Sequence, residues 1–246
     1  MTKHYEFILS PIENIIKEAT NAIELIGSGI ESYPLNEYIL KSIFLKMTGF
    51  QEQKFKCIAW EMATENYEFR IKFLNKFSNE GFSTYKSKNE LYKFLIEMLE
   101  REEFSEEEND KIIYESNELI KKVIGTSNLR YWNQFDYSEL EEIKNNDDTA
   151  KTIKKKKKNN KKKKGTYELL GNNLKGIYQK LYSHRNRLAH NTLSYQVNFP
   201  TLEELEQAKV GDNNYIIWFY ILIIIDKKMI KLYKEFYESN EDLIFN

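Results

Sequence analysis

The chain contains few residues of several types, and each shortage excludes a class of structure. It has 246 residues but only one cysteine, three prolines and nine glycines. The single thiol, Cys57, allows no disulfide framework and no cysteine-based zinc site within one chain, which favours a reducing, cytoplasmic location. Few glycines and prolines require few turns, so the composition favours long helices over many short strands.

Long hydrophobic runs are also missing. The longest extends over 11 residues from Tyr215 to Ile225, whereas a membrane-spanning helix needs about 20. The N-terminal segment has no basic stretch followed by an apolar one, so we expect no signal peptide. We therefore expect no membrane association. We interpret Tyr215–Ile225 as part of a helix at the centre of a bundle or at a subunit interface.

The charges nearly cancel, but they are unevenly distributed. The net charge is −1, yet ten of the 37 basic residues are lysines between Lys151 and Lys164. The remainder is acidic, so a uniformly basic nucleic-acid surface is not expected and any RNA contact must come from local patches. We expect residues 145–165 to form a flexible, disordered Lys- and Asn-rich insertion, because like charges repel and little there can be buried. It is either a low-complexity loop or an arm that attracts RNA.

Helix-start signals recur along the chain. The capping-box pattern, in which a hydroxyl and a carboxylate three residues later bind backbone amides, begins at Ser10, Ser87, Ser105, Ser138 and Thr201. Together with apolar residues at helical spacing, these signals predict a single all-α domain over residues 1–246. The predicted helices cover residues 11–25, 34–47, 51–77, 88–101, 106–124, 166–191 and 214–238, with a short helix from about 202.

The segment Arg185-Asn186-Arg187-Leu188-Ala189-His190, late in a predicted helix, concentrates reactive side chains. Asn186 and His190 are four residues apart and share a helix face, which Arg185 flanks. Histidine exchanges protons near neutral pH, and the arginine fork matches phosphate oxygens. RNA carries its own nucleophile, the 2′-hydroxyl. We therefore predict Arg185, His190 and Asn186 as catalytic residues that cleave RNA without a metal or cofactor.

Neighbouring residues are weaker candidates. Arg187, His184 and Asn191 lie at the margins of the same segment and could contact substrate. The alternative is that the segment is an ordinary helix end, because an arginine followed by histidine five residues later arises often by chance. The sequence shows no clustered His, Cys and carboxylate ligand set, so no metal site is predicted.

The pattern Arg185-Asn186-x-x-x-His190 resembles the signature of the HEPN superfamily, which is Arg, four to six residues, then His, often with a polar residue after the Arg. The resemblance implies a HEPN-like helical bundle that forms a homodimer, with two motifs facing each other in a composite, metal-independent endoribonuclease site. It also implies 2′,3′-cyclic phosphate and 5′-hydroxyl products. Members act in toxin–antitoxin, abortive-infection and CRISPR-linked defence, and in some eukaryotic RNA processing. Some HEPN toxins carry a tyrosine two residues after the histidine, where this chain has Thr192.

Several other features allow two interpretations. The polar turn Gln51-Glu52-Gln53-Lys54 is either a solvated helix start or packs on the motif helix and orients Arg185 or His190. Residues 126–137 form either an aromatic loop on the core or a set of base-stacking side chains. We interpret Cys57 as a core residue and expect His4 to be inert near an unstructured terminus.

Three functional hypotheses follow. The first is a homodimeric HEPN endoribonuclease that acts on RNA as a toxin or defence effector, restrained by an inhibitor, antitoxin or other regulatory partner. The second is a non-catalytic HEPN-like RNA-binding or regulatory protein, in which the motif holds phosphate without cutting. The third is a helical interaction protein whose last helix supplies a partner surface.

Overall fold

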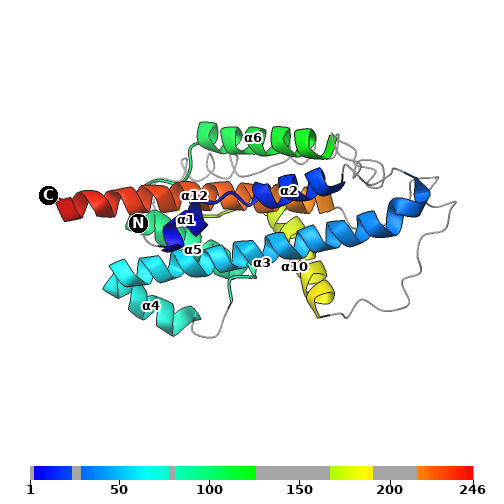
Figure 1. Ribbon diagram of the computed structural model, residues 1–246. Coiled ribbons are helices and arrows are strands. Elements are labelled where there is room, and N and C mark those ends of the chain that lie inside the picture. The colour runs from blue at the N-terminus through cyan, green and yellow to red at the C-terminus, as the bar shows by residue number, and fades with distance from the viewer. Residues whose placement is uncertain (1–2, 24–28, 78–80, 126–166, 191–214, 246) are drawn as a thin grey trace.

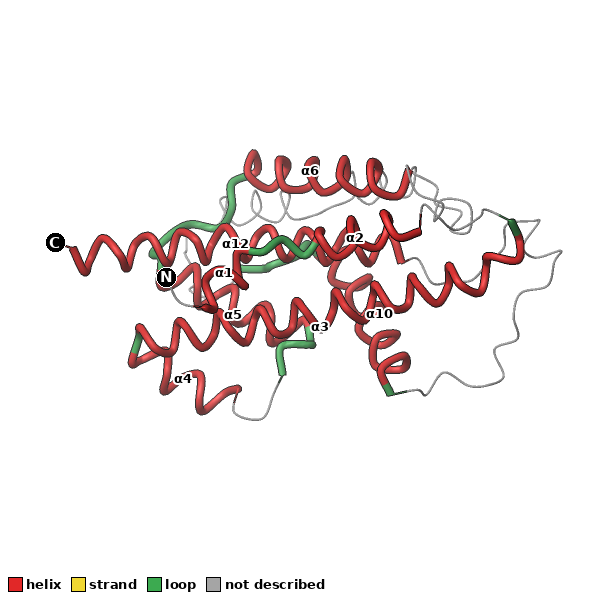
Figure 2. The backbone as a smooth tube through the Cα atoms, in the orientation of Figure 1, coloured by secondary structure: helices red, strands yellow, loops and turns green. Residues whose placement is uncertain are grey.

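The computed structural model describes residues 3–23, 29–77, 81–125, 167–190 and 215–245, and every regular element within these ranges is a helix (Figures 1 and 2). This confirms the all-α prediction for the described part of the chain. The elements are α1 (Lys3–Leu9), α2 (Glu13–Ile23), a 3₁₀ turn (Ile30–Ser32), α3 (Tyr33–Glu65), α4 (Tyr67–Phe77), α5 (Tyr85–Met98), α6 (Glu106–Gly125), α10 (Asn172–Ala189) and α12 (Tyr215–Phe245).

Helix α12 lies in the middle of the bundle, with α6 on one side and α3 on the other, and α10 crosses both α3 and α12 (Figure 1). Every side chain from Tyr215 to Asp226 is buried within the chain. Of the two interpretations of this apolar segment, the centre of the bundle is therefore the observed one. The segment offers no surface to a second copy or to another partner. None of the described helices combines the length and apolar character needed to cross a membrane.

Helix α3 differs from the sequence prediction, which ended one helix at Met47, before Gly49, and began the next at Gln51. The observed helix has 33 residues and continues through Gly49. A glycine inside a helix costs about 1 kcal/mol. Buried side chains on both sides of it, Phe44, Met47 and Phe55 among them, each contribute more than that when removed from water.

The predicted helix 51–77 is divided at Asn66, which adopts an extended backbone with φ −127° and ψ 115°. The Asn66 Oδ1 atom accepts a hydrogen bond from the Phe69 amide at 2.8 Å and so caps α4. Arg70 donates to the carbonyls of Ala63 at 2.7 Å and Thr64 at 3.1 Å, which satisfies the end of α3. Asparagine is favoured at such caps because its amide oxygen replaces a missing backbone partner.

The capping predictions had mixed outcomes. At α6 the predicted box is present, because Ser105 N donates to Glu108 Oε2 at 2.9 Å and Glu108 N donates to Ser105 Oγ at 3.2 Å. The prediction at Ser87 was wrong: Thr84 caps α5 by accepting from the Ser87 amide at 3.2 Å. The predicted starts at Ser138 and Thr201, the insertion 145–165 and the aromatic segment 126–137 lie outside the described residues.

The N-terminal segment is more ordered than predicted. Residues Lys3–Leu9 form α1, and His4 Nδ1 lies 2.7 Å from Glu61 Oε1 on α3. The expectation that His4 lies near an unstructured terminus was therefore wrong. Cys57 is buried, in agreement with its interpretation as a core residue.

Candidate functional site

Helix α10 carries the Arg185–His190 segment, and one buried face fixes its orientation. Leu174, Tyr178, Leu181 and His184 form this face at helical spacing. The helix starts at Asn172, six residues later than predicted, because Gly171 precedes it in an extended conformation. It ends at Ala189, so Arg185 and Asn186 lie in the last turns and His190 follows as the C-terminal cap.

The C-terminal cap brings His190 and Asn186 together through the backbone. The amide of His190 donates to the carbonyl oxygen of Asn186 at 3.0 Å. The side chain of His190 is exposed, and so is that of Arg187. The predicted arrangement, with Asn186 and His190 one helical turn apart, is therefore present. Asn191 lies outside the described residues.

Arg185 is held from two directions. Its Nη2 atom lies 3.1 Å from Oε2 of Glu52 on α3, and its Nη1 atom donates to Oδ1 of Asn186 at 3.2 Å. The side chain remains 24% exposed. A guanidinium has five N–H donors in a fixed fork, so these two contacts leave donors for a phosphate. Of the two interpretations of the polar turn, the one in which it packs on the motif helix is observed.

His184 faces inward, in contrast to His190. It is 2% exposed, its Nε2 atom lies 2.9 Å from the hydroxyl of Tyr215, and its ring packs against Trp218 and Phe44. Burial, assisted by the nearby charges of Arg187 and Lys41, lowers the pKa of His184 to about 4. The imidazole is thus neutral near neutral pH and fixes α10 on α12, which supports a structural role in place of the predicted substrate contact.

Beneath Arg185 lies a buried polar cluster formed by Gln51, Lys54, Lys88 and Asp226. Lys54 Nζ lies 2.6 Å from Asp226 Oδ1 and donates to the Ser10 carbonyl at 2.7 Å. Asp226 Oδ2 accepts from the Ile12 amide at 2.9 Å. These bonds tie α3, α12 and the segment before α2 together inside the core, where an unpaired charge is expensive.

Gln51 links this cluster to two further elements. Its Nε2 atom donates to the Leu222 carbonyl at 2.9 Å, and its Oε1 atom accepts from Lys88 Nζ on α5. Lys88 is 2% exposed, and its ammonium group lies over the rings of Phe55 and Tyr178. Burial lowers the pKa of Lys88 to about 7, while the charges of Glu52 and Asp226 raise it and that of Arg185 lowers it.

Lys88 and Asp226 are not among the site residues that the sequence predicts. For Asp226 a signal was present, because a carboxylate immediately follows the apolar run that ends at Ile225, and a charge there must be paired if the run is buried. Lys88 carries no such signal, since a lysine in the first turn of a helix is usually solvated.

The described residues contain no group of three or more His, Cys, Asp and Glu side chains placed to hold a metal ion. The end of α10 presents three functional groups: the guanidinium of Arg185, which Glu52 and Asn186 hold in place, the amide of Asn186 and the exposed imidazole of His190. Comparison with known proteins adds no relative: no family model, no curated protein and no solved structure matches the chain.

Proposed function

We propose that the chain is a metal-independent endoribonuclease of HEPN type that acts as a homodimer. The observation that carries the proposal is the pairing of Arg185 with Glu52 near the end of α10, five residues before the exposed imidazole of His190. A preorganised cation placed where negative charge develops stabilises a transition state without reorganisation at the moment of reaction. The carboxylate of Glu52 would hold the guanidinium in that orientation.

The proposed reaction is transfer of the phosphoryl group within the RNA. The 2′-oxygen attacks the adjacent phosphorus, the bond from phosphorus to the 5′-oxygen breaks, and a 2′,3′-cyclic phosphate and a 5′-hydroxyl form. His190 takes the proton from the 2′-hydroxyl or supplies one to the leaving 5′-oxygen, and the second copy of His190 in the dimer supplies the other transfer. Arg185 binds the non-bridging oxygens, and Asn186 orients Arg185.

The test compares cleavage of mixed single-stranded RNA by the wild type, Arg185→Ala and His190→Ala in the presence of EDTA, with product ends identified by mass spectrometry. Removal of a general acid–base typically costs about 10²- to 10⁴-fold, and removal of one donor that stabilises developing charge costs about 10²- to 10³-fold. Both variants should therefore lose at least about a hundredfold. The matched controls are Arg70→Ala and His4→Ala, which change the same residue types at positions remote from α10. Equal cleavage by all five proteins refutes the proposal.

A second candidate is an RNA-binding protein that does not cut. The contacts of Arg185 with Glu52 and Asn186 favour this candidate, because they occupy two of the guanidinium donors that could otherwise stabilise a transition state. It predicts salt-sensitive RNA binding that Arg185→Ala weakens, without new product ends. Either activity belongs in the cytoplasm, with a toxin or defence role and an inhibitor, antitoxin or other regulatory partner as the corresponding biology.

A further inference from the structure

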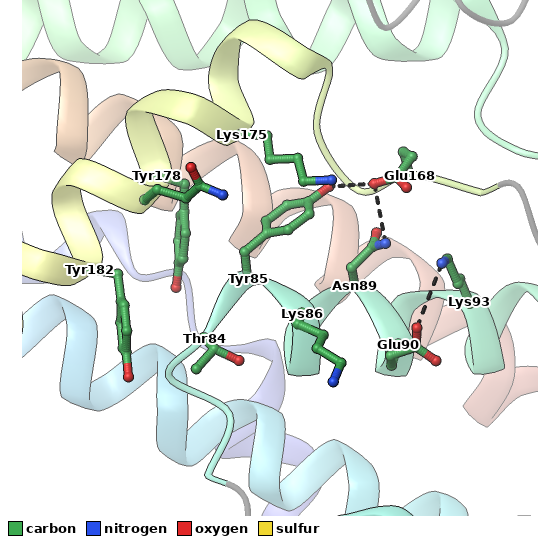
Figure 3. A pocket seen from close by; sticks show the side chains of 11 residues that line it. Thr84, Tyr85, Lys86, Asn89, Glu90, Lys93, Glu168, Lys175, Tyr178 and Tyr182 are labelled. Atoms are coloured by element: carbon green, nitrogen blue, oxygen red, sulfur yellow. Dashed lines mark hydrogen bonds and ion pairs between the residues drawn. The ribbon is translucent and has the colours of Figure 1, made fainter.

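A pocket of about 400 Å³ lies between α5 and α10, and its lining on α10 ends at Tyr182, three residues before Arg185 (Figure 3). Pockets that bind small molecules typically enclose about 300–1,000 Å³. We propose that this pocket binds one nucleotide of the single-stranded RNA substrate, next to the phosphate held by Arg185. The inference rests on the proposed function for the position of that phosphate, but it can be tested by binding alone.

The inner wall of the pocket is fixed by hydrogen bonds. Tyr85 donates to Glu168 Oε2 at 2.8 Å, and Asn89 Nδ2 donates to the same oxygen at 3.2 Å. Asn89 Oδ1 accepts from the Leu169 amide at 2.7 Å, and Tyr178 donates to the Ser83 carbonyl at 2.9 Å. These groups satisfy one another, so the wall is formed before any ligand arrives, and a preformed site avoids the cost of ordering side chains on binding.

The mouth of the pocket has different chemistry. Tyr182 and Gln179 from α10 and Lys86 from α5 line it, and Tyr182 is partly exposed while the other two are exposed. Figure 3 shows Tyr178 and Tyr182 projecting from α10 on the same side. An aromatic ring offers a stacking surface to any base, an amide can bind a base edge, and an ammonium group binds phosphate. This combination fits a nucleotide better than an apolar ligand.

The geometry of α10 places the pocket and the motif on one face. At about 100° per residue, Asn186 lies about 40° from Tyr182 around the helix axis, and Arg185 lies about 60° away on the other side. The three residues from Tyr182 to Arg185 advance the helix by about 4.5 Å, and a stacked strand advances about 3.4 Å per nucleotide. The base in the pocket therefore lies one or two nucleotides from the phosphate at Arg185.

Two lysines flank the pocket with partners of their own. Lys93 Nζ lies 3.7 Å from Glu90 Oε1, and Lys175 Nζ lies 5.2 Å from the ring centroid of Tyr85. Lys86 makes no such contact with the described residues. It is therefore the cation best placed to meet a phosphate.

The test measures binding of a short, fluorescein-labelled, single-stranded RNA to the full chain carrying His190→Ala, so that cleavage does not interfere. Stacking on an aromatic side chain contributes about 1–3 kcal/mol per base, so adding Tyr182→Ala should weaken binding about five- to hundredfold. Tyr182→Phe should retain the parent affinity. Lys86→Gln should reduce the slope of affinity against salt concentration by about one phosphate contact. Tyr114→Ala, at an exposed tyrosine on α6, is the matched control.

Two results overturn the inference. The first is RNA affinity that neither Tyr182→Ala nor Lys86→Gln changes, with folding confirmed by circular dichroism. The second is AMP binding as tight as RNA binding, which indicates a site for free nucleotides. Failure of the proposed function is separate: RNA binding that depends on Tyr182, with a wild type that cuts nothing, supports the pocket and refutes the nuclease.

Discussion

Arg185 and Glu52 are separated by 133 residues in the sequence, yet their side chains meet at 3.1 Å at the end of α10. The pair is partly exposed, with 24% of the arginine side chain and 16% of the glutamate side chain accessible. An exposed ion pair contributes only about 0–1 kcal/mol to stability. Its effect on the direction of the guanidinium can be larger than its effect on folding, and the two effects can be measured separately.

Glu52→Gln should reduce RNA cleavage by about tenfold or more, because small misplacements of a catalytic group cost up to about a hundredfold. The loss should appear in kcat, with KM little changed. The free energy of unfolding should fall by no more than about 1 kcal/mol. The measurements are single-turnover kinetics and urea denaturation.

The matched control for Glu52→Gln is Glu115→Gln. Glu115 pairs with Lys227 at 3.0 Å on a different part of the surface and is more exposed. Glu115→Gln makes the same chemical change as Glu52→Gln and should leave RNA cleavage unaltered. If both variants cut RNA at the wild-type rate, Glu52 does not position Arg185.

If the active site is formed by two chains, an inactive variant should inhibit RNA cleavage by the wild type when the two form mixed dimers. Because Tyr215–Asp226 is buried within one chain, the dimer now rests on the resemblance of the motif alone. A tenfold excess of the Arg185→Ala, His190→Ala double variant places about nine-tenths of wild-type chains in mixed dimers by mass action. Cleavage per wild-type chain should then fall up to about tenfold once subunits have exchanged. Unchanged cleavage, with a monomer in sedimentation, contradicts the composite site.

His184 predicts a defined loss of stability on mild acidification. Its pKa is 6.5 in the unfolded chain and about 4 in the folded one, so the unfolded chain binds a proton first as the pH falls. Stability from this group is complete above pH 6.5 and is lost between there and pH 4. From pH 7.5 to pH 5 the loss amounts to about 2 kcal/mol. Urea denaturation of His184→Gln, which can still meet the Tyr215 hydroxyl, should lack this part of the pH dependence. Parallel curves for the two proteins argue against a neutral His184.

Substitutions of Lys54 and Asp226 should have non-additive effects on the free energy of unfolding. Removing one partner of a buried ion pair costs about 3–5 kcal/mol because the other charge stays buried alone. Lys54→Met and Asp226→Leu should each destabilise by about this amount. The double variant should be less destabilised than the sum, by up to about 3 kcal/mol. Additive losses in denaturation experiments indicate that the two charges do not stabilise one another.

Gly49→Ala should stabilise the chain. A β-carbon at Gly49 meets no atom within 4 Å, and alanine is favoured over glycine inside a helix by about 1 kcal/mol. Gly176 in α10 has the same open surroundings, so Gly176→Ala should also increase the free energy of unfolding and serves as the matched comparison. Destabilisation by Gly49→Ala in a denaturation experiment contradicts a continuous α3.

Local signals predicted some helices well, although the capping box expected at Ser87 was wrong. The start of α6 followed from its capping box, and the burial of α12 followed from its apolar run. The junction at Gly49 was wrong because the cost of one glycine is smaller than the stabilisation from core side chains on both sides. The break at Asn66 was missed because it depends on Arg70 reaching back to the last carbonyls of α3.

The candidate site was predictable only in part. The spacing of Arg185, Asn186 and His190 on one helix is a local property, and the structure has it. The inward direction of His184 depends on Tyr215, and the partner of Arg185 is on α3. Such contacts depend on how helices pack, which hydrophobic periodicity does not specify. Glu52 could be named as one of two interpretations, whereas Lys88 could not be named at all.

One turn of α3, from Gln51 to Lys54, connects three other helices, since it reaches Lys88 on α5, Arg185 on α10 and Asp226 on α12. A substitution in this turn therefore also affects the residue that its side chain contacts on another helix. Replacement of Arg185 removes one of two cations that contact Glu52, the other being Lys56 at 3.0 Å. Replacement of Asp226 leaves the buried ammonium group of Lys54 without its carboxylate. Among sequences related to this chain, substitutions at positions 52 and 185 should therefore covary, and so should substitutions at positions 54 and 226.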